Sequence, residues 1–347
     1  MYRSYEMRSS SASDQPRRAL PAFYRLGTFV ALVILALASR NASASHSTFT
    51  SGDVILGGQT PTLVIITSRI DWFHADGSFN KRLVEAVDDF PDDFAFDATG
   101  NLYAVTSYAI RVFDPAGNYV GDFGTLPPFA ARAMTFDAAG HAYVAANTPS
   151  GNLVMLDASG VQLRSFALPG DSRVGGPGIS SIDLGSDQCT LFYAAHNRIG
   201  RFNVCTNSLM ADVTSALPGS GAASIRVLPG GNLLVAAVET IDIVDVSTGS
   251  VTKTFDLPNQ DRWGSVAINP GGSSFWAGSF DTAARFDLAS GSVTASVHPA
   301  DYILRAVGVV GEPRAATLGL AGIPTMSRLI LVLLCLAMAL VAVWRVA

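Results

Sequence analysis

The chain has 347 residues, of which 49% are hydrophobic and 15% are charged. This apolar content supports a large core and excludes an intrinsically disordered chain. Residues 45–322 keep 15 of the 23 basic and 26 of the 28 acidic residues, a net charge of −11. A segment this acidic repels phosphate backbones, so nucleic-acid binding is disfavoured.

The first 44 residues have the three parts of a secretory signal peptide. Arginines precede an apolar run at Leu26–Ala38, and the small-x-small triplet 42–44 follows it. This order predicts a signal helix that is cleaved between Ala44 and Ser45. The alternative is an uncleaved anchor, but the run is only about 13 residues long and a membrane span needs about 20.

A pattern of four short apolar runs joined by tight turns recurs six times between residues 50 and 311 and is clearest at Asp92–Phe123. Gly, Pro, Asn and Asp separate the runs, which is typical of strands connected by hairpins. A glycine follows each third run, except in the fourth copy, where Thr206-Asn207 takes its place. The third runs end 40 to 46 residues apart, at His74, Asp114, Asp157, Asn203, Asp245 and Asp287. Four strands at this period predict an all-β fold, a six-bladed β-propeller.

The two ends of the array complement each other. The first copy lacks its first strand, and the run Leu304–Val310 is left unpaired after the last copy. We expect strand 304–310 to become the inner strand of the first blade and so to close the ring. The predicted organisation is a signal peptide at 1–44, a propeller at 45–311, a linker at 312–322 and a membrane segment at 323–347.

The phrases FDATGNLYAV (96–105) and IRVFDPAGNYVGDF (110–123) resemble bacterial propellers of the NHL and SMP-30/gluconolactonase-like type. The resemblance covers the whole array and implies the fold without implying an activity. A gluconolactonase-like site would need a Glu, an Asn and an Asp gathered on one divalent metal. The array and linker hold three glutamates, Glu85, Glu239 and Glu312, and none of them opens an inner strand. We therefore predict no catalytic residue.

Two of the three cysteines, Cys189 and Cys205, lie 16 residues apart in the fourth copy. In an exported sheet this pair predicts a disulfide, and two buried free thiols are the alternative. The fourth copy also resembles a recurrent blade of exported propellers of this group, which implies the same bridge.

An acidic run, Asp88, Asp89, Asp92 and Asp93, places four carboxylates within six residues between the first two blades. Oxygen ligands at this density are a candidate site for Ca²⁺ or for a cationic group. The alternative is a solvated turn. Apart from this possible calcium ion, no cofactor is expected.

Two further sets of residues are candidates for binding a ligand. Propeller sites commonly lie where the inner strands begin, around the central channel. The residues expected at these positions are Asp92, Asp93, Arg132, Ser180, Ser181, Ser224, Arg226, Gly264, Ser265 and Arg305. Trp72, Trp263 and Trp276 are candidate platforms for sugar rings, with packing between blades as the alternative.

The C-terminal tail has three parts: the motif Ile323, Pro324, Thr325 and Met326, an apolar run at 329–343, and Arg345 near the end. This tail resembles the IPTL-CTERM protein-sorting domain of Gram-negative bacteria, which implies an exosortase-type enzyme that cuts or transfers the chain at the motif. The chain departs from the family pattern in having Met326 in place of Leu and a single basic residue at the end. The alternative is a plain C-terminal transmembrane helix, and in either case the segment is predicted to enter the membrane.

These features together predict an exported propeller at the extracellular face of a Gram-negative cell envelope. It would bind a surface polysaccharide or a protein without catalysing a reaction. The alternative is a lactonase- or lyase-like enzyme that uses a divalent metal in the channel. Three oxygen ligands meeting at metal-like distances in the channel would favour the enzyme.

Overall fold

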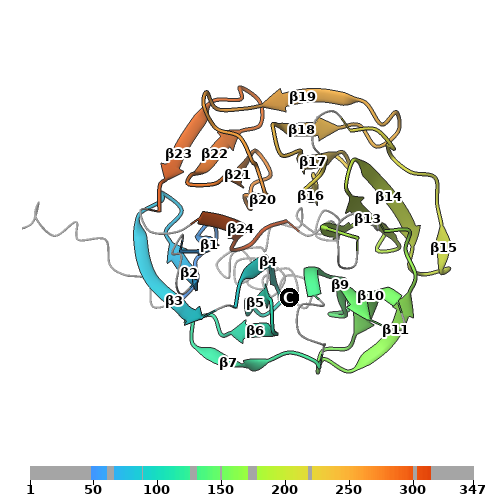
Figure 1. Cartoon of the computed structure of the whole chain (residues 1–347), viewed down its shortest axis with the longest axis horizontal. Helices are drawn as coiled ribbons and strands as arrows, with labels where there is room; N and C mark the ends of the chain where they lie inside the picture. The colour runs from blue at the N-terminus through green and yellow to red at the C-terminus, as the bar shows by residue number, and fades with distance from the viewer. Residues whose placement is uncertain are drawn as a thin grey trace, which may run out of the picture. The chain divides into compact units, whose positions relative to one another are not determined.

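The computed structural model describes residues 48–60, 66–87, 89–125, 131–148, 151–170, 178–217, 221–299 and 303–313. Its sheets, six in number and each of four antiparallel strands, follow one another in a ring (Figure 1). The predicted six-bladed propeller is therefore confirmed. No helix among the described residues is long and apolar enough to cross a membrane. The two predicted terminal helices, the cleavage site at Ala44 and Ser45, Asp88, and the sorting motif at 323–326 lie outside the described residues.

Each blade runs from an inner strand at the channel to an outer strand at the rim (Figure 1). In that order, blades one to three consist of β24 (Ile303–Val309), β1 (Val54–Gln59), β2 (Thr67–Phe73) and β3 (Phe79–Val87); β4 (Pro91–Phe96), β5 (Leu102–Thr106), β6 (Ile110–Phe113) and β7 (Tyr119–Asp122); and β8 (Ala131–Phe136), β9 (Ala142–Thr148), β10 (Gly151–Leu156) and β11 (Gln162–Phe166). Blades four to six consist of β12 (Ser181–Leu184), β13 (Thr190–Ala195), β14 (Arg198–Asn203) and β15 (Ser208–Leu209); β16 (Ser224–Val227), β17 (Leu233–Ala236), β18 (Ile241–Val244) and β19 (Val251–Phe255); and β20 (Ser265–Ile268), β21 (Ser274–Gly278), β22 (Ala283–Asp287) and β23 (Val293–Val297).

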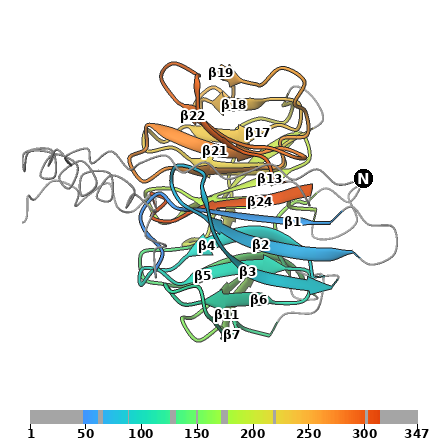
Figure 2. The same cartoon turned by 90° about the vertical axis from the view of Figure 1, so that its left-hand side faces the viewer.

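The two ends of the array meet in blade one. β24 pairs with β1 in antiparallel register, from Val54 opposite Val309 to Gln59 opposite Ile303. Figure 2 shows these two strands side by side, although one is near the start of the propeller and the other near its end. The strand that the sequence left unpaired thus completes the first blade.

In the part of the chain that the structure describes, the apolar core is divided into six clusters, each shared by two neighbouring blades. Side chains alternate along a strand, so a central strand packs one face on the preceding blade and the other on the following blade. Trp72, Trp263 and Trp276 are fully buried in three of these clusters. They therefore pack between blades and are not sugar platforms.

The turn after each third strand has the conformation that its residues favour. The glycines in these turns, Gly77, Gly117, Gly160, Gly249 and Gly291, have φ between 69° and 88°. In blade four Asn207 takes this place with φ of 55°. Asparagine tolerates the left-handed region better than most residues with a side chain, so the break in the pattern leaves the turn intact.

The predicted disulfide between Cys189 and Cys205 is present in blade four. It joins the turn before β13 to the turn after β14, next to β15, which has two residues. The covalent bond therefore secures the edge of the sheet at the point where the outer strand offers little pairing.

Candidate functional site: the central channel

The inner strands are the free edges of the sheets, so their outward N–H groups lack a partner within the sheet. Among the described residues, six side chains at the channel accept hydrogen bonds from these groups over 2.6–3.4 Å. The acceptors are Asp93, Ser181, Asp183, Ser224, Ser265 and Glu312, and their donors are, in the same order, the N–H groups of Met134, Ile225, Val227, Val266, Val307 and Ile268. Four of these acceptors, Asp93, Ser181, Ser224 and Ser265, were predicted at the channel, and each ties its inner strand to the next one.

Arg226 crosses the channel from blade five to blade two. Its Nη2 donates to Oδ1 of Asp93 over 2.8 Å, and its Nε lies 3.5 Å from Oε1 of Glu312. The Arg226 and Asp93 side chains are each 7% exposed. Removing one member of an ion pair this deeply buried leaves the other as an uncompensated charge. This pair is therefore a strut between opposite blades.

Carboxylates outnumber guanidiniums around this strut. Burial raises the pKa of Glu312 to about 7, while the Arg226 charge acts to lower it. Burial also raises the pKa of Asp183, again against the charge of Arg226. Since Asp93 also faces Arg226, one cation cannot compensate all three carboxylates, and proton uptake relieves the excess negative charge.

A cavity of about 590 Å³ opens beside this cluster, where the inner strands end; we call it the lower mouth. A largely apolar cavity with a few convergent polar groups is the usual form of a ligand pocket. Its apolar lining includes Phe94, Phe96, Phe136, Leu184 and Pro270, and its polar lining includes Asp183, Gln188, Arg226 and Glu312.

The opposite end of the channel, where the inner strands begin, is the upper mouth. Here Asp92 lies between two arginines from the neighbouring blades. Nη1 of Arg132 donates to its Oδ2 over 3.0 Å, and Nη2 of Arg305 donates to its Oδ1 over 2.6 Å. The cluster therefore carries a surplus of one positive charge within an acidic ring.

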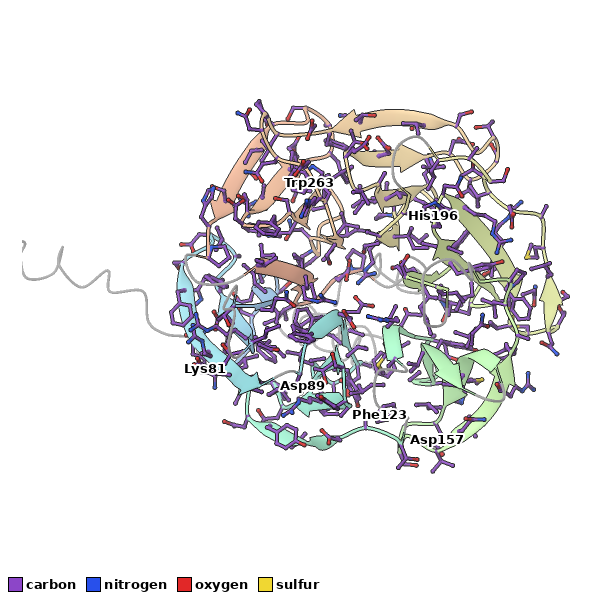
Figure 3. The ribbon with its side chains drawn as sticks, in the orientation of Figure 1. Lys81, Asp89, Phe123, Asp157, His196 and Trp263 are labelled. Carbon is purple, nitrogen blue, oxygen red and sulfur yellow. A yellow bond between two sulfur atoms is a disulfide. The ribbon has the colours of Figure 1, made fainter. Side chains whose placement is uncertain are left out.

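The structure separates the members of the acidic run. Asp89 pairs with Arg111 of β6, with Oδ2 2.5 Å from Nη2, and lies in blade two (Figure 3). Asp92 lies at the upper mouth and Asp93 on the strut, while Asp88 is outside the described residues. The described part of the chain contains no group of three or more His, Cys, Asp or Glu side chains that could hold a metal. A calcium ion at the run stays a prediction, and it would compete with arginines for the carboxylates of Asp89, Asp92 and Asp93.

Two channel residues were not identified from the sequence. Asp183 is a carboxylate in the middle of the otherwise apolar segment Ile182–Leu184 of an inner strand, and that contrast could have identified it. Glu312 was assigned to the linker, but its carboxylate bonds to Ile268 and faces Arg226. No local signal marks it, because the nearest partner of its carboxylate is 44 residues away in sequence.

No family model matches the chain, including those of the NHL, SMP-30 and IPTL-CTERM families that its sequence resembles, and no curated protein matches its sequence. A protein of unknown function from Bacteroides caccae matches with a TM-score of 0.57 and 11% identity over 76% of this chain and 100% of that one. A chain of a nidogen/laminin complex matches with a TM-score of 0.58 and 12% identity over the same shares. At these identities the likeness shows the propeller fold alone.

Proposed function

We propose that this protein is an exported, envelope-anchored propeller that binds another molecule at the cell surface without catalysing a reaction. The observation that carries the proposal is the pairing of the carboxylates where the inner strands begin. Asp92 is held by two arginines and Asp93 by Arg226. A lactonase-like metal site needs several oxygen ligands around one ion. Beside both carboxylates the positive charge comes from guanidinium groups, which take the place that a metal ion would need. This favours binding over metal-dependent hydrolysis.

The cellular address in this proposal rests on the two terminal segments and on the disulfide. The N-terminal segment has the order of a signal peptide, and the tail resembles a sorting domain that an exosortase-type enzyme processes. The Cys189–Cys205 bond fits an oxidising compartment outside the cytoplasm. The partner would then be a surface polysaccharide or a protein of the envelope of a Gram-negative bacterium.

The binding role is tested on the full chain purified in detergent. The purified protein is screened for binding to bacterial polysaccharides and envelope proteins, with and without Ca²⁺. In parallel it is assayed for turnover of lactones. We expect saturable binding without turnover. Lactone hydrolysis that stops on chelation of the metal would contradict the proposal and support the metal-dependent alternative.

The address is tested by deleting Ile323–Ala347 and following the protein between the cell fraction and the medium. We expect the deletion to release the propeller into the medium, because it removes the predicted membrane segment. The matched control deletes the linker residues 314–322 and keeps the tail, and it should stay with the cells. An unchanged distribution of the tail deletion would remove the sorting claim.

One observation favours an enzyme as the second candidate. Glu312 lines the lower-mouth cavity and has a pKa near 7, and a carboxyl group that titrates near neutral pH is suited to proton transfer. Such an enzyme should show a pH–rate profile with an inflection near 7 that Glu312→Gln abolishes. A wild-type protein without turnover on esters and lactones would eliminate this candidate.

A further inference from the structure

The charge at the upper mouth is opposite in sign to that of the ring around it. Arg132 and Arg305 share the single carboxylate of Asp92, whereas residues 45–322 carry a net charge of −11. The side chains of Arg132 and Arg305 are 37% and 34% exposed. An anion that enters the channel can therefore reach both guanidinium groups.

Both arginines keep donors beyond those that bind Asp92. A guanidinium carries five N–H donors, and each of these bonds uses one of them. Within the described part of the chain, Nε of Arg305 is buried without a hydrogen-bond partner, and its Nη1 reaches Oε1 of Gln59 only at 3.5 Å. The ring of Phe90 lies 5.6 Å from the guanidinium carbon of Arg305, a cation–π contact that favours one orientation of the group.

The wall opposite the arginines is formed by small, uncharged residues. Ser181, Ser224 and Ser265 each accept an N–H from the next blade as Asp93 does, so the residue before each of them is equivalent to Asp92. These residues are Ser180, Ala223 and Gly264. Ser180 is exposed, and a Cβ added to Gly264 would meet only a backbone oxygen, at 3.8 Å. Among the described residues, the charged side chains lie on one half of the upper mouth. The other half has small, uncharged residues that leave space for a ligand.

This arrangement selects the charge and the shape of a ligand. A surplus of one positive charge is matched by one negative charge, whereas a dianionic phosphate would leave excess negative charge in an acidic protein. The planar fork of arginine also matches the two oxygens of a carboxylate.

We propose that the upper mouth binds the carboxylate of an acidic saccharide through Arg132 and Arg305, with the sugar ring over Ser180, Ala223 and Gly264. The identity of the ligand as a saccharide rests on the binding function proposed above.

The test compares two ligands that share one sugar ring and differ in whether its single carboxyl group is free or esterified. The methyl glycoside of galacturonic acid, a monoanion, and its methyl ester are titrated calorimetrically into the full chain in detergent. We expect the acid to bind at least about tenfold more tightly than the ester, since a charged hydrogen bond contributes more than a neutral one. The preference should shrink as salt is raised.

The residues are tested with Arg132→Gln and Arg305→Gln, each expected to lower the affinity for the acid by about tenfold or more. The control is Arg164→Gln, which changes an exposed arginine on the outer strand β11 and should bind as the wild type does. Ser180→Glu keeps the Asp92 cluster but places a carboxylate on the opposite wall, and should also lower the affinity for the acid. Circular dichroism melts of all the variants separate lost binding from lost fold.

Equal affinity for acid and ester, no binding of the acid, or full affinity in both arginine variants would overturn the anion site. If neutral saccharides bound instead, the anion site would fall while the binding function stood. Hydrolysis of the glycosidic bond of the acid would count against the binding function itself.

Discussion

Glu312 makes two contacts that favour its charged form, while its burial favours the neutral form. Arg226 and the Ile268 N–H stabilise the carboxylate, but desolvation prevails and raises the pKa to about 7. An unfolded glutamate has a pKa of about 4.3, so the folded state binds a proton more readily than the unfolded state. The stabilisation from this protonation is fully present below about pH 4.3 and is lost as the pH rises through about 7.

We therefore predict that Glu312→Gln makes stability less dependent on pH. Glu312 should make the wild-type free energy of unfolding fall by up to about 1.4 kcal/mol per pH unit between pH 5 and 7, because its carboxyl keeps a proton in the folded state that it has lost in the unfolded state. The Gln variant should lose this part of the slope and keep the part that comes from Asp183, whose pKa is also raised. Urea unfolding at pH 5, 6, 7 and 8 measures both slopes, and parallel curves would refute the prediction.

A second prediction at this scale concerns the strut. Arg226→Met should lower the free energy of unfolding by about 3–5 kcal/mol, because Asp93 would keep a buried charge without its partner. Arg226→Met combined with Asp93→Asn should recover part of the loss. Arg164→Met is the surface control and should change little. If the single and double variants unfolded at the same urea concentration, the strut would have no electrostatic role.

At the scale of single elements, blade four has the weakest outer pairing. β15 bonds to β14 through two residue pairs, and the Cys189–Cys205 disulfide lies beside it. Closing a loop of this length by a disulfide contributes about 3 kcal/mol. We predict that Cys189→Ser with Cys205→Ser lowers the free energy of unfolding by about that amount in urea titrations. Adding a reductant should destabilise the wild type and leave the double variant unchanged, and equal stabilities would contradict the expectation.

Strands and turns were predictable where their signals are local. The third strands and their glycine turns follow a period that lies within each copy, and Asn207 filled the missing position as its backbone preference indicates. The acidic run was harder to interpret because Asp92 and Asp93 are neighbours in sequence. On strand β4 neighbours point to opposite sides, so the two carboxylates reach different arginines. The Arg226–Asp93 pair spans 133 residues and has no local signature.

At the scale of the whole molecule, the ring is closed by the pairing of β24 with β1, which we call the seam. The seam depends on two glycines. Gly57 of β1 and Gly308 of β24 both pack on Phe94 of the next blade, where an added Cβ would lie 2.7 Å from that side chain. Only glycine allows β24 and β1 to approach blade two this closely.

We predict that Gly308→Ala lowers the free energy of unfolding by about 1–3 kcal/mol, because it overpacks the seam. Gly230→Ala is the matched control, since a Cβ there meets nothing within 4 Å. Thermal melts followed by circular dichroism compare the two. Equal melting temperatures would show that the seam yields without cost.

The seam also determines when the ring can close during synthesis. β1 ends at Gln59 and its partner β24 begins at Ile303, so a ribosome that has just made the first strand must still add 244 residues. At about 5–20 residues per second this takes roughly 12–50 s. For that time the nascent chain exposes a bare strand edge, which is a template for aggregation. Newly made copies should therefore rely on a holding chaperone until the last strand arrives.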